Sequence, residues 1–227
     1  MNGMIIAIDG ACRRPGTPEC IAVGACVVRD IQTSKVITHG AAAEFQSSSQ
    51  RGEILGLILA LEQCLNQEYE TCYILTDSEY VFNTVDKEWY RNWANKRWKT
   101  VDGGDVKNKD LWESVMGLMD ALEDRDIVYY HVKGHVIPFG KATARNLTEK
   151  DPTLQLLYKE IVNKFIKEYD IRQQSLIDAC ELFERNNGIK MYPAAQVFRD
   201  MITTNILADT VAGLYADSVI KGNDSEK

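Results

Sequence analysis

The chain has 227 residues, 45% of them hydrophobic, and a formal net charge of −7, which is the composition of a globular protein with a sizeable buried core. The negative charge argues against a broadly basic surface, so contact with a nucleic acid would need a local basic patch. The six cysteines form no CxxC pair and no metal-binding spacing with the histidines, so we expect reduced thiols in a cytoplasmic protein. The start of the chain does not resemble a signal peptide, and no apolar stretch is long enough to span a membrane.

The N-terminal part of the chain predicts three consecutive strands followed by a helix. Met4–Asp9 is a short apolar run that ends in an acid, and Cys20–Arg29 and Lys35–Phe45 are apolar runs separated by polar turns. From Gln50 the apolar residues recur with a helical period, and Ser47–Ser49 offer candidate N-caps. These segments predict a three-stranded antiparallel meander that leads into an amphipathic helix.

The next part predicts two further strands joined through helices. Cys72–Thr76 is a fourth strand, again followed by an acid, and Ser78 to about Trp93 is predicted to be helical. A polar loop over Asn95–Lys109 leads to a helix over Asp110–Leu122 and a fifth strand over Ile127–Val132. This order predicts an α/β fold, in which a mixed five-stranded sheet combines the meander of strands 1–3 with strands 4–5 and is flanked by helices.

The C-terminal part differs in character from the rest of the chain. Residues 136–204 carry a strong apolar stripe at helical spacing, too regular and too apolar for a disordered linker, and predict an added helical insertion. A last helix is expected over Asn205–Ile220, followed by a flexible tail at 222–227. Residues 1–135 and 205–221 would then form the main domain.

Four acids stand where a metal site would need them. Asp9 and Asp77 end two strands, and Glu53 and Asp209 lie in the predicted first turns of two helices. Mg²⁺ and Mn²⁺ prefer oxygen ligands, and two such ions close together can hold the attacking and leaving oxygens of a phosphodiester. Each acid taken alone is explained equally well by helix capping or by the helix dipole.

Five short motifs follow one another in a characteristic order. They are Ile8–Gly10 (IDG), Arg51–Glu53 (RGE), Thr76–Val81 (TDSEYV), Val132–His135 (VKGH) and Asn205–Asp209 (NILAD). In this order, and on these elements, they resemble the type 1 ribonuclease H family. The strand-TDSxYV junction is the most specific of the five, whereas IDG alone carries little weight.

The resemblance implies an endonuclease that hydrolyses the RNA strand of RNA–DNA hybrids, leaving 5′-phosphate and 3′-hydroxyl ends, with two Mg²⁺ as cofactors and Mn²⁺ as a substitute. It implies that Asp9 bridges both ions, that Glu53 and Asp77 bind the ion on the leaving-group side, and that Asp209 binds the ion that activates water. His135 would assist proton transfer or the release of product and metal.

A basic segment supports the same resemblance independently of the acids. Between Lys87 and Lys109 there are seven Lys or Arg residues and three acids, a local charge of +4, interleaved with tryptophans. This segment is similar to the basic protrusion of the bacterial enzymes, although helix packing and a solvated face would explain part of it. Trp89, at helical spacing, is expected in the core. The candidate substrate-binding residues are Arg13, Arg14, Gln50, Arg51, Trp93, Lys96, Arg97, Trp98, Lys99, Lys107 and Asn205.

The chain departs from the family pattern in three places. The turn Ala11–Gly16 lacks the usual Asn-Pro, so Arg13 and Arg14 would replace it by charge, and Gln50–Gly52 stands where an Asn-Arg pair is typical. The 69 residues between His135 and Asn205 replace a handful in the family. The insertion could extend the substrate contact through Lys141 and Arg145, hold a protein partner or stabilise the fold. Asn205 is explained equally well as the N-cap of the last helix.

Two alternative functions stay open at this point. One is a related-fold nuclease with another substrate, such as an exonuclease or a junction resolvase. The other is an inactive module that binds hybrids or double strands, against which the four acids argue, because clustered carboxylates without metal would repel phosphate. We expect a monomer that binds the RNA–DNA hybrid and does not associate with membranes.

Overall fold

A computed structural model describes residues 2–132 and 195–225, together with the isolated residues Ile177, Asp178, Glu181 and Arg185. The strands are β1 (Gly3–Arg13), β2 (Ile21–Asp30), β3 (Val36–Phe45), β4 (Thr71–Thr76) and β5 (Asp126–His131). The helices are α1 (Ser49–Asn66), α2 (Glu79–Asp86), α3 (Trp89–Asn95), α4 (Lys109–Ala121) and α7 (Ala195–Ser225). The sheet order is β3-β2-β1-β4-β5, with β1, β2 and β3 antiparallel and β4 and β5 parallel to β1, which confirms the predicted mixed sheet.

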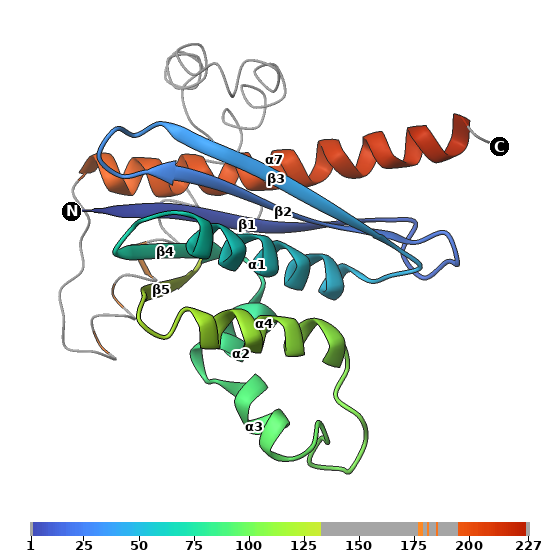
Figure 1. Cartoon of the computed structure of the whole chain (residues 1–227). Helices are drawn as coiled ribbons and strands as arrows, with labels where there is room; N and C mark the ends of the chain where they lie inside the picture. Colours follow the sequence, from blue (N-terminus) through green and yellow to red (C-terminus); the bar gives the residue numbers. More distant parts are fainter. Residues whose placement is uncertain (1, 133–176, 179–180, 182–184, 186–194, 226–227) are drawn as a thin grey trace.

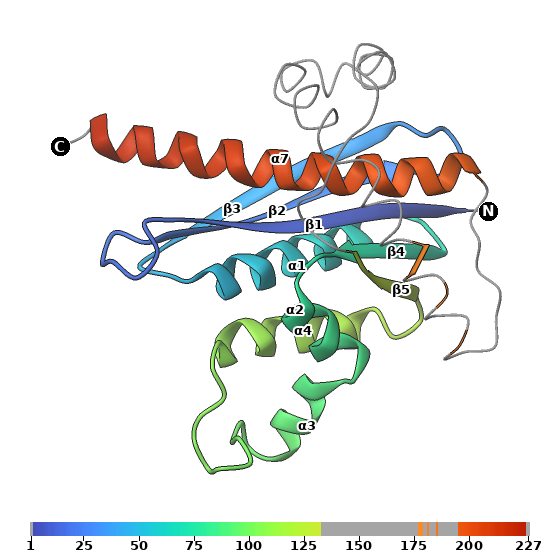
Figure 2. The same ribbon diagram turned by 180° about the vertical axis from the view of Figure 1, so that it is seen from behind.

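Helices cover both faces of the sheet. Alternate residues of β1 point to opposite sides, so Ile5 packs with Ile206 of α7 in one cluster, and Ile6 packs with Leu57 of α1 in another. Figures 1 and 2 show α7 crossing one face, while α1 covers the other with α4 beside it. The helix α3 and the loop after it project away from this body (Figure 1).

One helix in the first part of the chain begins where the sequence predicts, and another is divided in two. The first helix begins as expected, since the Ser48 hydroxyl accepts a hydrogen bond from the Arg51 backbone and caps α1. The single helix predicted from Ser78 to Trp93 is wrong, because the chain forms α2 and α3 with a break between them. Glu88 lies in the break with a left-handed φ of 48°, which no continuous α-helix can contain.

The last helix also differs from the prediction at both ends. It begins at Ala195 rather than Asn205 and continues to Ser225, past the predicted start of the tail at residue 222. Its early residues Met201 and Ile202 are 1% and 2% exposed in the core, and this burial favours helix well before Asn205. Asn205 and Asp209 therefore lie inside a long helix, and the N-cap interpretation of Asn205 is wrong.

Most of the predicted insertion, residues 136–204, lies outside the described residues, as do His135, Lys141 and Arg145. The end of the insertion, residues 195–204, is the first part of α7 and packs on the sheet. None of the helices in the described part of the chain is both long and apolar enough to cross a membrane.

A buried polar network joins the start of α7 to the turn between β2 and β3. Arg29, only 4% exposed, donates from Nε to the Thr204 hydroxyl at 2.8 Å and from Nη1 to the Ser34 carbonyl at 2.5 Å. The Ser34 hydroxyl donates to Asp200 at 2.6 Å, and Asp200 is fully buried. Buried charges of this kind are stable only when they are paired and hydrogen-bonded, so the network fixes α7 against the sheet.

The Thr204→Val variant should lower the free energy of unfolding by about 1–3 kcal/mol, because the buried Arg29 side chain then loses a hydrogen-bond acceptor. Thr203→Val is the matched control, since the Thr203 hydroxyl donates to the Asp200 carbonyl of its own helix at 3.1 Å. Urea unfolding curves of the two variants test the difference. Equal destabilisation by both would mean that the Arg29 contact contributes nothing measurable.

Candidate metal centre

Asp9 and Asp77 are brought together by the pairing of β1 with β4. The two strands run parallel and pair from Gly3 with Thr71 to Ala7 with Leu75. Each acid lies two residues beyond the last pair, where the strands separate. The carboxyl ends of adjacent parallel strands lie side by side, so both acids project from the same edge of the sheet.

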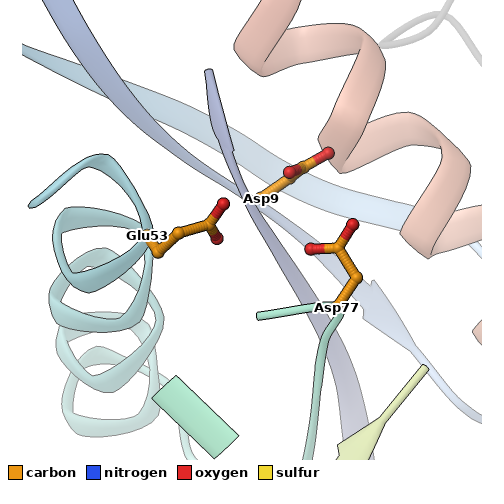
Figure 3. A group of neighbouring side chains, drawn as sticks. All are labelled: Asp9, Glu53 and Asp77. Atoms are coloured by element: carbon orange, nitrogen blue, oxygen red, sulfur yellow. The ribbon is translucent and has the colours of Figure 1, made fainter. Parts of the chain in front are cut away.

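Glu53 reaches this edge from the first turns of α1. It lies next to Gly10, where a Cβ would come within 2.7 Å of the Glu53 carboxyl group, so only glycine leaves room for it. Ligand oxygens of Asp9, Glu53 and Asp77 all lie within 4.8 Å of one another. Figure 3 shows the three side chains converging from β1, α1 and the end of β4 on one space.

The Glu53 carboxyl group is unusually placed for an acid. Burial, followed by the negative charges of Asp77 and Asp209, raises the pKa of Glu53 to about 8, although a hydrogen bond from the Gly10 backbone opposes the shift. Glu53 Oε2 is buried and has no hydrogen-bond partner among the described residues. An unpartnered buried carboxylate oxygen beside two further acids is the donor set that Mg²⁺ or Mn²⁺ would complete.

Asp209 contributes its charge from the other face of the sheet. It lies in the middle of α7, which runs past Asp9 in Figure 3. Its charge raises the pKa of Glu53, so it lies within electrostatic range of the centre. It is nevertheless outside the close group formed by Asp9, Glu53 and Asp77. The four predicted acids therefore fall into a close group of three and one acid nearby.

The region around Asp77 contains a residue whose position the sequence did not point out. His131 Nε2 lies 3.2 Å from the Asp77 carbonyl, and its ring stacks on Phe82 with centroids 5.4 Å apart. The Val132 amide donates to the Thr76 carbonyl at 2.8 Å, and Ser78 caps α2 on the other side. These contacts hold the Asp77 backbone from both directions. An aromatic residue followed by His at the end of β5 carries no motif that could have signalled this contact.

Three of the candidate substrate arginines are paired with acids. Arg51 bonds both oxygens of Glu44, at 2.6 and 2.7 Å, and also Asp110. Arg13 bonds Asp217 of α7, and Arg14 bonds Glu19 within its own turn, each at 2.7 Å. A contact from these arginines to a phosphate would have to replace or share these ion pairs. Gln50 is exposed at the start of α1, and Asn205 is 3% exposed inside α7.

The structure reverses the expected burial of two tryptophans in the basic segment. Trp98 is 8% exposed and packs in the core, whereas Trp89, expected in the core, is 37% exposed. Arg97 and Trp98 both adopt left-handed φ angles, and the Trp98 amide donates to the Trp93 carbonyl at 2.7 Å, so the chain turns the Trp98 ring inward. Trp98 is thus poorly placed to contact a substrate.

The exposed residues of the segment surround a hollow of about 530 Å³. Its lining combines aromatic and basic side chains: Trp89, Asn92, Trp93, Lys96, Lys99, Thr100 and Val101. Lys96, Arg97, Lys99 and Lys107 are all exposed, and Lys99 bonds Asp105 at 2.6 Å. Aromatic faces next to cations suit the sugars and phosphates of a nucleic-acid strand.

Comparison with known proteins gives a consistent result. The sequence model of the RNase H family matches residues 1–151. The chain is 32% identical over 135 residues to Ribonuclease H of Clostridium botulinum (strain Hall), which covers 60% of this chain and 85% of that protein. It is 36% identical over 135 residues to Ribonuclease H of Rhodopseudomonas palustris (strain BisB5), which covers 60% and 82%. The solution structure of the PFV RNase H domain matches with a TM-score of 0.50 at 17% identity, over 77% of this chain and 94% of that domain.

Proposed function

The chain belongs to the ribonuclease H family, and from this premise we propose that it cuts the RNA strand of RNA–DNA hybrids at the Asp9, Glu53 and Asp77 carboxylates. The observation that carries the proposal is the convergence of three carboxylates, one with a buried and unpartnered oxygen, at the edge of the sheet. Both relatives named above are called Ribonuclease H, which favours a hybrid over the substrate of an exonuclease or a resolvase. The unpartnered Glu53 oxygen favours an active enzyme over an inactive binding module.

In the proposed cleavage reaction, the role of each residue would follow from its position. Asp9, Glu53 and Asp77 would hold two divalent ions, Mg²⁺ or Mn²⁺, with Asp209 contributing charge or a further ligand from α7. Divalent ions bound there supply neutralisation of phosphate charge and activation of a water molecule. The acids would act on the scissile phosphate through bound ions, because bare carboxylates repel a phosphate. We expect His135 to assist proton transfer and the protein to act as a monomer.

A cleavage assay tests the proposal directly. RNA labelled at its 5′ end is supplied as an RNA–DNA hybrid, as single-stranded RNA and as double-stranded RNA, each with Mg²⁺, Mn²⁺ or EDTA. Metal-dependent internal cuts confined to the hybrid, with 3′-hydroxyl products, are expected. Cleavage of another substrate would leave the metal centre standing and overturn the substrate assignment. Tight hybrid binding without cleavage in either metal would favour the inactive module.

We propose that the basic segment binds the phosphate backbone of the hybrid. Lys96→Ala should weaken hybrid binding and reduce the slope of log affinity against log salt concentration by about one, as expected for a lost phosphate contact. Lys35→Ala, an exposed lysine in the turn between β2 and β3, is the control. Fluorescence anisotropy over a range of salt concentrations measures the slopes. Identical slopes for both variants would place the hybrid elsewhere on the surface.

Asp209 lies beyond the residues that the family model matches, so its role needs its own test. Asp209→Asn is expected to lower the rate of hybrid cleavage by roughly ten- to hundredfold, the range for groups that support a metal centre from its periphery. Asp217→Asn, on the same helix and half exposed, should stay within about threefold of the unmodified enzyme. Unchanged cleavage by Asp209→Asn at low Mg²⁺ concentration would remove Asp209 from the site.

A further inference from the structure

Helix α1 approaches β2 more closely than side chains would allow. A Cβ at Gly24 of β2 would lie 2.2 Å from the Gly56 amide nitrogen and 2.5 Å from the Gly52 carbonyl oxygen of α1. A Cβ at Gly52 would lie 2.7 Å from the Val23 carbonyl oxygen. Real Cβ atoms essentially never come within 3.0 Å of a non-bonded heavy atom of a residue that is not a chain neighbour. Gly24, Gly52 and Gly56 therefore form a contact, here named the glycine seam, in which two backbones touch directly.

The helix keeps these glycines against its own conformational preference. Glycine in a helix interior costs about 1 kcal/mol relative to alanine, and α1 carries two of them one turn apart. Gly117 in α4 shows the contrast, because a Cβ there would meet nothing within 4 Å. The helix stability lost at Gly52 and Gly56 is thus linked to the close approach of the two backbones, which a side chain at either position would obstruct.

The glycine seam lies directly beside the metal centre. Glu53 follows Gly52 in the chain, and a Cβ at Gly56 would lie 3.3 Å from the carbonyl oxygen of Asp9. On the neighbouring strand, Gly10 leaves the space in which the Glu53 carboxyl group lies. A shift of the first turns of α1 away from β2 would therefore carry Glu53 away from Asp9 and Asp77.

We infer that the glycine seam is a positioning element of the metal centre, which sets the separation of Glu53 from Asp9 and Asp77. This inference rests on the proposed function. Gly24, Gly52 and Gly56 touch neither metal nor substrate in this assignment, and they act through the backbone that carries Glu53. Metal centres hold their ligands within tight distance limits, so a displacement of a few tenths of an ångström is enough to weaken binding.

The test is the affinity of the metal-free protein for Mn²⁺, measured by isothermal titration calorimetry. Gly56→Ala is the main variant, since its Cβ contacts of 3.1–3.4 Å demand only a small adjustment and the fold should survive. We expect its Mn²⁺ affinity to fall on the order of tenfold. Gly24→Ala, with its 2.2 Å contact, should lose more, and Gly117→Ala should bind as the unmodified protein does. Thermal unfolding in EDTA monitors the fold of each variant.

A double-mutant cycle separates positioning from a purely structural role. In the Glu53→Gln background, Gly56→Ala should change the Mn²⁺ affinity less than twofold, because the ligand that it displaces is already gone. A Gly56→Ala variant that melts earlier but binds Mn²⁺ normally would overturn the inference, as would a tenfold loss that persists in the Gln background. Failure of the unmodified protein to bind Mn²⁺ would instead overturn the metal centre itself.

Discussion

The Asp77→Asn variant is expected to lose hybrid cleavage on the order of a thousandfold and to melt at a higher temperature than the unmodified protein in EDTA. The two effects have one cause. Asp77 lies with Asp9 and Glu53 in a group of carboxylates within 4.8 Å of one another. With metal bound, this group of carboxylates would lower the activation free energy of cleavage by several kcal/mol. Each 1.4 kcal/mol corresponds to a tenfold change in rate. Without metal, the same charges repel one another.

The prediction is specific because cleavage activity and melting temperature are expected to change in opposite directions. Asparagine is close to aspartate in size, so the hydrogen bonds at the Asp77 backbone should persist, while a negative charge that opposes ionisation of Glu53 is removed. Each kcal/mol released raises the melting temperature by about 2–4 °C for a chain of this size. A residue with only a structural role would lose both stability and activity when it is replaced.

The measurements are initial cleavage rates in Mg²⁺ and thermal unfolding in EDTA. Asp124→Asn, at an exposed acid in the turn before β5, removes the same charge far from the cluster and should change neither quantity appreciably. A drop in melting temperature for Asp77→Asn, together with lost activity, would indicate that the side chain holds the fold together. Retained activity would remove Asp77 from the centre.

The sequence predicted the sheet and the three close acids well, for a physical reason. Met4–Asp9 is an apolar run that ends in an acid, and Cys72–Thr76 is an apolar run followed by one, and both patterns are local properties of the chain. The predicted end of the first strand at Asp9 is wrong, because β1 stays paired with β2 and continues to Arg13. Parallel pairing then places Asp9 and Asp77 at one edge. The glycine contacts at Gly24 and Gly52 could not have been predicted, because single glycines do not show which backbone lies above them.

The predictions that are wrong have a different cause. Each concerns a feature that depends on contacts between segments distant in sequence. The predicted start of the last helix at Asn205 is wrong because the preceding turns are held by distant residues: Thr204 accepts a hydrogen bond from Arg29 of β2, and Asp200 accepts one from Ser34. The burial of Trp98 depends on the left-handed backbone angles of Arg97 and Trp98 after α3, and Trp89 begins α3 directly after the left-handed Glu88. Helical spacing alone carries no information about either.

Whether the predicted arginines are available to bind a substrate also depends on residues distant in sequence. Arg51 precedes Glu53 in a motif that suggests a role in gripping the substrate, but its guanidinium group bonds Glu44 from β3 and Asp110 from α4. The ion pairs tie the first turn of α1 to two neighbours. Arg51 therefore supports the position of Glu53, which agrees with the tight contact of the same turn with β2.

Metal binding should release a proton below pH 8, with an affinity for Mn²⁺ that rises as the pH rises. Burial and the neighbouring acids raise the pKa of Glu53 from 4.5 to about 8 in the metal-free protein. A divalent ion needs the carboxylate form, so between these pH values the ion must displace the proton. The apparent affinity should increase by up to about tenfold per pH unit in this window and level off above pH 8.

The same pKa shift makes the metal-free protein less stable as the pH rises. Between pH 4.5 and about 8 the folded protein keeps a proton on Glu53 that the unfolded chain releases, so the folded state binds more protons than the unfolded state. Its stability is therefore highest below pH 4.5 as far as this group is concerned, and it falls on the order of a few kcal/mol as the pH passes through the window. Most acids in proteins have lowered pKa values and contribute the opposite trend.

Two measurements test the linkage. Calorimetric titration with Mn²⁺ at pH 6.5, in two buffers with different ionisation enthalpies, counts the protons released, and a value near one is expected. Urea unfolding in EDTA at several pH values should show the loss of stability, and Glu53→Gln should flatten it, because glutamine cannot titrate. Equal pH dependence in both proteins would mean that Glu53 is already ionised near neutral pH. The repulsion would then be relieved by solvent or by a neighbouring group rather than by protonation of Glu53.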